Sequence, residues 1–206
     1  MARLICVGLT GGIGCGKTTV ARLLTDRRAY LIDTDEAARA TLTKGRSVWD
    51  RVVKSFGRGI LTANGEIDRQ KLGAIVFRDP KKRAKLEGIV HPPVRRMWRR
   101  ALAQYARERR FRVAVVDVPL LYEVNIARLF DAVVVVATSR PTQMKRLQTR
   151  GMSRREVEAR IAAQWPLQRK IDLADYVVWN DGSRQALRQQ VETIWKTISD
   201  GNVGVS

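Results

Sequence analysis

The stretch that decides the fold is residues 4–21, LICVGLTGGIGCGKTTVA, in which an apolar run leads into a glycine-rich segment. Residues 11–18 match the phosphate-loop pattern G-x-x-x-x-G-K-[ST], and residues 19–24 can begin a helix directly after it. Glycines allow the tight turns that direct successive backbone N–H groups at phosphate oxygens, and the helix N-terminus adds partial positive charge. The sequence therefore predicts a nucleotide phosphate site between a buried strand and a helix.

The residues of this loop have separate expected roles. Lys17 can reach the β- and γ-phosphates of the nucleotide, and the Thr18 hydroxyl can coordinate Mg²⁺. Cys15 stands at a free position of the pattern, where passive filling of the loop is favoured over a redox switch. The residues expected to bind the nucleotide here are Gly11, Gly12, Ile13, Gly14, Cys15, Gly16, Lys17, Thr18 and Thr19.

The apolar runs along the chain predict an α/β fold. Runs of strand length occupy residues 4–8, 30–33, 113–117, 132–137 and 176–179. Several are continuous rather than alternating, which is typical of parallel strands covered on both faces. Helix-like stretches lie between them, so we expect one domain over residues 1–206 with five parallel strands and helices on both faces.

The spacing of the strands is uneven, which predicts two helical insertions. One is expected at about residues 34–112, because that interval is too long for a single crossover helix. The other is expected at about residues 140–175, where Gly151 can end one helix and Ser153 can cap the next.

Composition limits the class of protein. Among 206 residues there are 39 Lys and Arg against 20 Asp and Glu, a formal net charge of +19. The excess indicates either anionic partners or the arginine codon bias of a GC-rich genome. Cys6 and Cys15 form no CxxC pair, so a disulfide framework or a cysteine zinc site is not expected. No apolar run approaches the roughly 20 residues of a membrane helix. A cytoplasmic enzyme without a membrane partner is therefore predicted.

A phosphate loop alone does not separate kinases from other nucleotide-hydrolysing proteins. The NKxD motif that usually accompanies guanine specificity does not occur in the sequence. A short chain with two helical insertions suits a small-molecule kinase, in which one insertion holds the phosphate acceptor and the other closes over ATP. ATP and Mg²⁺ are the expected cofactors.

At this point the sequence resembles the dephospho-coenzyme A kinase family. The resemblance is carried, in the family's order, by GLTGGIGCGKTTVA at 8–21, IDTDEAAR at 32–39, FG at 56–57, DR at 68–69, VFRDP at 76–80, IVHPPV at 89–94, VVDVPLLYE at 115–123, RL at 146–147, RIAAQ at 160–164 and ADYVVWNDG at 174–182. It implies a three-layer P-loop kinase fold with an acceptor-binding insertion and a lid. It also implies ATP- and Mg²⁺-dependent phosphorylation of the ribose 3′-hydroxyl of dephospho-coenzyme A, the last step of coenzyme A synthesis.

Three acidic residues follow predicted strands, at the sheet edge where ligands bind in parallel α/β folds. Asp33 and Asp35 follow the apolar part of the second strand, and a carboxylate there can orient an attacking hydroxyl and accept its proton. The resemblance favours Asp35 as this base and Asp33 as its support, while either acid alone can instead cap the next helix. Asp117 ends the third strand and either holds Mg²⁺ or makes a structural hydrogen bond.

The resemblance also implies where the acceptor and the rest of ATP bind. His91, the only histidine, is favoured for acceptor binding or a structural hydrogen bond over proton transfer. Arg146 is the strongest candidate to stabilise the transferring phosphoryl group, since guanidinium groups suit its oxygens. Asn180 belongs to a loop like the adenine-binding loop of related kinases. The remaining expected acceptor contacts are Thr10, Pro119, Leu120, Leu121, Arg150 and Arg160.

Two rival functions remain open. One is a kinase of the same class with another acceptor, such as a nucleoside monophosphate, against which the segments DVPLLYE and HPP argue. The other is a basic nucleic-acid-binding NTPase, which the charge favours but the 6% aromatic content does not. We therefore expect a small-molecule partner, no nucleic acid, and a monomer or small homo-oligomer.

Overall fold

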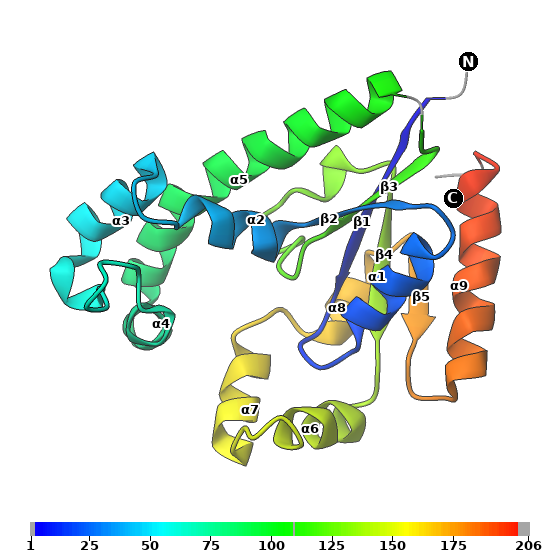
Figure 1. Ribbon diagram of the computed structural model, residues 1–206. Helices are drawn as coiled ribbons and strands as arrows, with labels where there is room; N and C mark the ends of the chain where they lie inside the picture. The colour runs from blue at the N-terminus through cyan, green and yellow to red at the C-terminus, as the bar shows by residue number, and fades with distance from the viewer. Residues whose placement is uncertain (1–2, 109, 202–206) are drawn as a thin grey trace. The chain divides into compact units, whose positions relative to one another are not determined.

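The computed structural model describes residues 3–108 and 110–201, and within them the strands form one five-stranded sheet in the order β2-β3-β1-β4-β5 (Figure 1). β1 (Ile5–Gly11) pairs in parallel with β3 (Val113–Asp117) and with β4 (Ala132–Ala137), and β4 pairs in parallel with β5 (Tyr176–Trp179). β2 (Tyr30–Asp33), next to β3, and β5 are the two edge strands. This confirms the predicted α/β class.

Helices occupy most of the chain between the strands. In chain order they are α1 (Lys17–Thr25), α2 (Thr34–Thr41), α3 (Ser47–Phe56), the 3₁₀ helix η1 (Arg58–Ile60), α4 (Arg69–Arg78), α5 (Pro80–Glu108), the 3₁₀ helix η2 (Ala127–Leu129), α6 (Arg140–Gln148), α7 (Arg154–Ala162), α8 (Leu167–Asp172) and α9 (Arg184–Ser199).

The first strand differs from its prediction. The apolar run suggested residues 4–8, whereas β1 extends to Gly11, and its last residues pair with β4 up to Gly11↔Val136. Thr10 and Gly11 look like loop residues in the sequence. They join the sheet because β4 continues alongside them and pairs with both residues, an effect that local propensity does not contain.

The sheet buries apolar side chains on both faces. On one face, Val7 and Leu9 of β1 join a core with residues of α1 and α9 that includes Leu24 and Val191, and Figure 1 shows these two helices on the same side of the sheet. On the other face lie Ala114 and Val116 of β3, Val133 and Val135 of β4, and Leu121, all of them buried. Continuous burial explains why β3 and β4 read as unbroken β-branched runs.

The chain divides into two compact units. Residues 1–32 and 105–206 make up the first, which carries the phosphate loop, and residues 33–104 make up the second. The second unit consists of α2, α3, α4, η1 and most of α5. The 140–175 segment belongs to the first unit and contains α6, α7 and α8.

Local signals define the helices of the 140–175 segment as the sequence suggested. Gly151 adopts a φ of 84° between α6 and α7, and Ser153 caps α7 in a capping box with Glu156. Within the described residues, no helix has the length and apolar character needed to cross a membrane.

Candidate active site

The phosphate loop connects the end of β1 to the start of α1. Gly16 is the N-cap of α1, with φ 91° and ψ 28°, in the left-handed region that favours glycine. A Cβ atom at this position would overlap the side-chain amide of Asn180. Both the backbone conformation and the close approach of Asn180 therefore require glycine at the second glycine of the motif.

The loop presents unsatisfied backbone donors. In the described part of the chain, the N–H groups of Gly14, Gly16, Lys17 and Thr18 donate no hydrogen bond. Backbone N–H groups are nearly always paired in folded proteins unless they face solvent or a ligand. A row of free N–H groups at a helix N-terminus is the arrangement that binds phosphate oxygens.

The carbonyl groups of the loop face the opposite way and are held by side chains. The Asn180 Nδ2 amide donates to the carbonyl oxygen of Cys15 at 2.8 Å, and Arg146 Nη1 lies 3.4 Å from the carbonyl oxygens of Gly14 and Cys15. In a trans peptide the C=O and the following N–H point in opposite directions. Holding the Cys15 carbonyl therefore directs the N–H of Gly16 to the free side of the loop.

Arg146 is fixed by its other contact. Its Nη2 donates to the carbonyl oxygen of Asn180 at 2.8 Å, so the guanidinium bridges the phosphate loop and the end of β5. Arg146, predicted to stabilise the transferring phosphoryl group, and Asn180, predicted to bind the nucleotide, therefore contact the loop directly and each other.

Asp181, the next residue, anchors this corner. Its carboxylate accepts hydrogen bonds from Thr138 and Ser139, including the Ser139 backbone N–H at 2.7 Å. Desolvation raises the pKa of Asp181, but the hydrogen bonds from Thr142, Thr138 and Ser139 outweigh it and hold the pKa well below its usual range. The carboxylate is thus ionised, and it ties the loop after β5 to the start of α6.

Lys17 is paired with Asp117. The Lys17 Nζ lies 2.5 Å from Asp117 Oδ1, and the two side chains are 17% and 11% exposed. Lys17 begins α1 directly after the phosphate loop, and Asp117 ends β3, which pairs with β1 in the register Leu9↔Asp117. Thr18 follows on the first turn of α1 and is exposed. One ammonium, one carboxylate and one hydroxyl thus lie at the end of the phosphate loop.

The loop after β3 is held beneath this end of the sheet. The carbonyl oxygen of Pro119 accepts hydrogen bonds from Thr10 Oγ1 at 3.2 Å and from Lys170 Nζ at 3.3 Å. Leu120 is half-buried, whereas Leu121 is fully buried against Phe130 and the backbone of Gly8. Thr10, Pro119 and Leu120 therefore lie together, and Leu121 packs into the core beneath them.

Lys170 of α8 is a buried cation. Its side chain is fully buried, and Nζ lies 2.8 Å from Oε1 of Glu123, which also accepts from the backbone N–H of Trp165 at 2.9 Å. The second carboxylate oxygen of Glu123 is buried and has no hydrogen-bond partner among the described residues. The pair joins the loop after β3 to α8.

The remaining predicted residues lie in the second unit or on the surface. The Asp33 side chain caps α2 by accepting from the backbone N–H groups of Asp35 at 2.8 Å and Glu36 at 3.0 Å, and Asp35 is exposed. Asp33 can thus cap α2 and support Asp35 at the same time, since the cap also fixes the backbone of Asp35. Arg150 and Arg160 are exposed on the 140–175 segment.

His91 is half-buried in α5, in the second unit. Burial lowers its pKa, Glu87 opposes this shift, and Arg95 adds to it. The imidazole is therefore neutral at neutral pH, as a binding or structural hydrogen bond requires. Cys15 is buried, and burial raises the pKa of its thiol, which keeps it protonated and unreactive.

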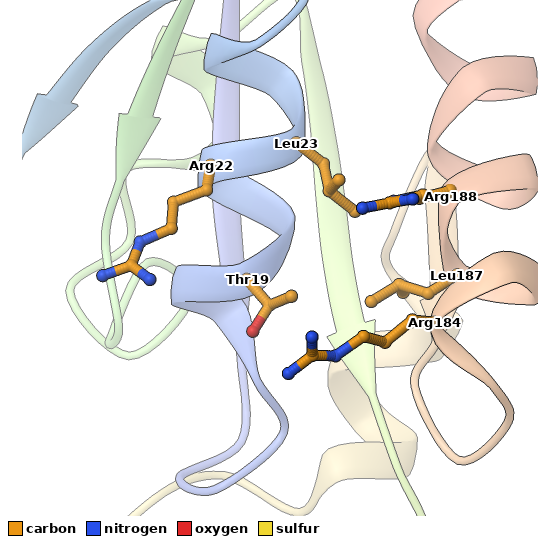
Figure 2. A pocket seen from close by; sticks show the side chains of 6 residues that line it. All are labelled: Thr19, Arg22, Leu23, Arg184, Leu187 and Arg188. Atoms are coloured by element: carbon orange, nitrogen blue, oxygen red, sulfur yellow. The ribbon is translucent and has the colours of Figure 1, made fainter.

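A pocket of about 270 Å³ lies next to the loop, between α1 and α9. Figure 2 shows the side chain of Arg184 extending from α9 toward Thr19 of α1. The residues that line the pocket are Thr19, Arg22, Leu23, Arg184, Leu187 and Arg188. The pocket lies beside Thr19, which was predicted to bind the nucleotide. Its arginine side chains make its walls cationic.

Several residues of the site were not predicted. Gln143 and Gln164 contact the phosphate loop, Lys170 holds the loop after β3, and Arg184 lines the pocket. Gln164 lies in the segment RIAAQ that carried the family resemblance, and Gln143 precedes Arg146 by one helical turn on α6. These two signals were available in the sequence, whereas nothing local marks Lys170 as buried.

Comparison with known proteins identifies the family. The family model described as "Dephospho-CoA kinase" matches residues 5–186. A dephospho-CoA kinase of Geobacillus kaustophilus is 43% identical over 196 residues, covering 93% of this chain and 96% of that protein. One of Symbiobacterium thermophilum is 45% identical over 199 residues, covering 96% of this chain and 83% of that protein.

Solved structures agree with the sequence comparison. TT1252 from Thermus thermophilus has a TM-score of 0.80 and 30% identity, covering 95% of this chain and 98% of that chain. A dephospho-CoA kinase from Campylobacter jejuni has a TM-score of 0.70 and 26% identity, covering 96% of this chain and 98% of that chain. A shikimate kinase from Bacteroides thetaiotaomicron, at 15% identity and a TM-score of 0.51, shares the fold. These matches confirm the resemblance, and the chain belongs to the dephospho-CoA kinase family.

Proposed function

We propose that this chain transfers the γ-phosphoryl group of ATP to the ribose 3′-hydroxyl of dephospho-coenzyme A, giving coenzyme A and ADP in the final step of coenzyme A synthesis. The observation that carries the mechanism is the set of free N–H groups of Gly14, Gly16, Lys17 and Thr18, beside the Lys17 ammonium. Such a cradle supplies several donors to the β- and γ-phosphates and stabilises the charge that the transferring group carries.

Lys17 exchanges partners when ATP binds. Asp117 holds the ammonium next to the loop at 2.5 Å, so the side chain is ordered before the nucleotide arrives. The β- and γ-phosphates then compete with Asp117 for the ammonium. Arg146, already positioned by the carbonyl oxygens of Cys15 and Asn180, is proposed to contact the transferring group from the side of the 140–175 segment, which acts as the lid.

The residues present fit a magnesium ion. Mg²⁺ binds few protein oxygens and keeps water and phosphate ligands, and the Thr18 hydroxyl and the Asp117 carboxylate are of this kind. Thr18 would hold the ion directly on the first turn of α1, with Asp117 nearby at the end of β3. The bound ion would neutralise charge on the β- and γ-phosphates.

Asp35 is proposed to receive the acceptor's proton. The 3′-oxygen forms the new bond to the γ-phosphorus while the bond from that phosphorus to the β–γ bridging oxygen breaks. The hydroxyl proton passes to the Asp35 carboxylate, and ADP leaves with the electron pair of the broken bond. Asp33 supports this role, because its cap fixes the backbone of Asp35.

The two substrates are assigned to different surfaces. The insertion at about 34–112, with His91, is proposed to bind the acceptor together with the residues after β3 and the lid arginines Arg150 and Arg160. The nucleoside half of ATP is proposed to lie between Asn180 and the pocket lined by Thr19 and Arg184. The enzyme is proposed to act on small molecules in the cytoplasm as a monomer or small homo-oligomer.

The test is an assay with ATP, Mg²⁺ and a panel of acceptors, with coenzyme A formation followed by chromatography. Dephospho-coenzyme A should be phosphorylated, nucleoside monophosphates should not, and a 3′-deoxy analogue should bind without consuming ATP. Folded Lys17→Ala should lose about 10² to 10³ in turnover, the cost typical of removing one donor to a charged transition state. Equal turnover with a nucleoside monophosphate, or normal activity of Lys17→Ala, would exclude the assignment.

A further inference from the structure

Two glutamine side chains of the 140–175 segment form hydrogen bonds with the backbone of one residue of the phosphate loop. Gln164 Oε1 accepts a hydrogen bond from the backbone N–H of Ile13 at 2.9 Å. Gln143 Nε2 donates to the carbonyl oxygen of Ile13 at 2.8 Å. One glutamine therefore acts as an acceptor and the other as a donor, on either side of the same Cα atom.

The contact of Gln143 determines the direction of a phosphate-binding group. The Ile13 carbonyl belongs to the peptide that also carries the N–H of Gly14, and in a trans peptide these two groups point in opposite directions. Fixing the carbonyl on Gln143 therefore turns the Gly14 N–H to the free side of the loop. Asn180 and Arg146 do the same for Gly16 through the Cys15 carbonyl.

The loop is built to admit Gln143. Gln143 as a whole residue is only 4% exposed, and its Nε2 also lies 3.4 Å from Cys15 Sγ. A Cβ atom at Gly12 would lie 2.7 Å from Nε2, so a larger residue there would displace the glutamine. One turn further along α6, Leu147 is fully buried against Gly14. The face of α6 that meets the loop is thus closely packed against it rather than exposed to solvent.

We propose that Gln143 and Gln164 are positioning residues that hold the phosphate loop in its ATP-binding conformation before ATP arrives, an inference that rests on the proposed function. Neither side chain needs to touch ATP. Losing either contact allows the loop to populate other conformations, and the apparent affinity falls with the fraction of protein whose loop is competent to bind. Once ATP is bound, its own hydrogen bonds hold the loop, so turnover changes less.

The opposite hydrogen-bonding roles provide a matched test. Gln164→Glu keeps an acceptor for the Ile13 N–H, whereas Gln143→Glu removes the donor and places a carboxylate against the Ile13 carbonyl. Gln143→Met and Gln164→Met preserve size while removing hydrogen bonding at each position. Gln148→Glu, on the exposed end of α6, adds the same charge away from the loop and controls for repulsion of ATP.

The measurements are equilibrium binding of ATP without acceptor, then KM for ATP and kcat, with urea denaturation to confirm folding. Both methionine variants and Gln143→Glu should weaken ATP binding about five- to tenfold, the factor given by about one net hydrogen bond, with kcat within about threefold. Gln164→Glu and Gln148→Glu should bind like the wild type.

The proposal fails if Gln164→Glu is as impaired as Gln164→Met, or if Gln143→Glu binds ATP normally. It also fails if kcat falls as much as affinity, since the glutamines would then act in the transfer step. Should Gln143→Glu not fold, the comparison of Gln164→Met with Gln164→Glu still decides. Because ATP binding is measured without acceptor, an inactive wild type would overturn the proposed function and not this inference.

Discussion

Asp33 and Asp35 are two residues apart and have different environments. Both residues are exposed, but the Asp33 carboxylate caps α2 by accepting from two backbone N–H groups, whereas Asp35 lies in the first turn of that helix. A capping residue contributes to stability whether or not it takes part in catalysis. Asp35 follows the end of β2 by two residues, and its side chain is exposed, as its proposed role of accepting a proton from a substrate hydroxyl requires.

We expect Asp35→Asn to lower kcat by about 10² to 10⁴, the usual contribution of a general base, with a smaller change in KM for ATP. Asp33→Asn should change kcat less, because asparagine caps helices as well as aspartate does. Asp33→Ala should lower the free energy of unfolding by about 1 kcal/mol through loss of the cap. Steady-state kinetics and urea denaturation measure these effects. If Asp33→Asn were the inactive variant, the two acids would have to exchange roles.

The burial of His91 leads to a prediction about how the free energy of unfolding depends on pH. Burial lowers its pKa from the usual value of about 6.5, so the unfolded chain binds the proton more readily than the folded chain. The free energy of unfolding should therefore fall as the pH drops from about 6.5 through the folded-state pKa, and His91 should have no effect at higher pH. His91→Gln should remove this component from urea denaturation curves.

The same residue can be followed directly, since it is the only histidine. An NMR titration of the imidazole should give a midpoint below about 6.5 in the folded protein. A midpoint at or above that value would show that burial does not dominate the environment of His91.

At the scale of elements, the Lys170–Glu123 pair joins α8 to the loop after β3. Lys170→Met leaves a mostly buried carboxylate without its cation and should cost about 3–5 kcal/mol in the free energy of unfolding. Combining it with Glu123→Gln should recover most of that loss, because replacing both members of a buried pair is far less costly than replacing one. A double-mutant cycle by urea denaturation measures the difference.

If Lys170→Met instead cost under about 1 kcal/mol, the pair would behave like an exposed ion pair. The same variants report on the site, because Lys170 also holds the Pro119 carbonyl that Thr10 contacts. A rise in KM for the acceptor, without a rise in KM for ATP, is expected in the double variant.

At the scale of the whole molecule, the charge of +19 should act on the approach of anionic substrates. Raising the salt from about 0.01 M to about 0.1 M shortens the Debye length from about 30 Å to about 10 Å. The value of kcat/KM for ATP and for the acceptor should fall across this range, while kcat at saturation stays nearly constant. A kcat/KM that does not respond to salt would contradict electrostatic attraction of substrates.

Experiments with nucleic acid distinguish a charge that attracts small anionic substrates from the charge of a nucleic-acid-binding NTPase. Retention on nucleic acid should be weak and lost at moderate salt, as for any basic surface, and nucleic acid should not stimulate ATP hydrolysis. Stimulation would instead support an NTPase that works on nucleic acid.

Local sequence determined the phosphate loop and most of the strands. β2, β3, β4 and β5 begin and end where their apolar runs do. For β3 and β4 the reason is that strands buried on both faces need unbroken apolar residues. The glycines and Lys17 of the loop could be predicted from the sequence. Phosphate binding depends on backbone conformation and one positive charge, and eight consecutive residues supply both. The family resemblance then supplied the substrate, which composition and spacing did not contain.

Tertiary structure alone decided the partners of the polar side chains. Lys17 lies against Asp117, Gln164 against Ile13, and Lys170 against Glu123, and each pair joins residues far apart in the sequence. Lys170 sits in a polar helix and would be taken for a surface residue. It is buried because a carboxylate from another loop compensates its charge. Such pairings depend on which elements the sheet brings together, and no local pattern of residues encodes that choice.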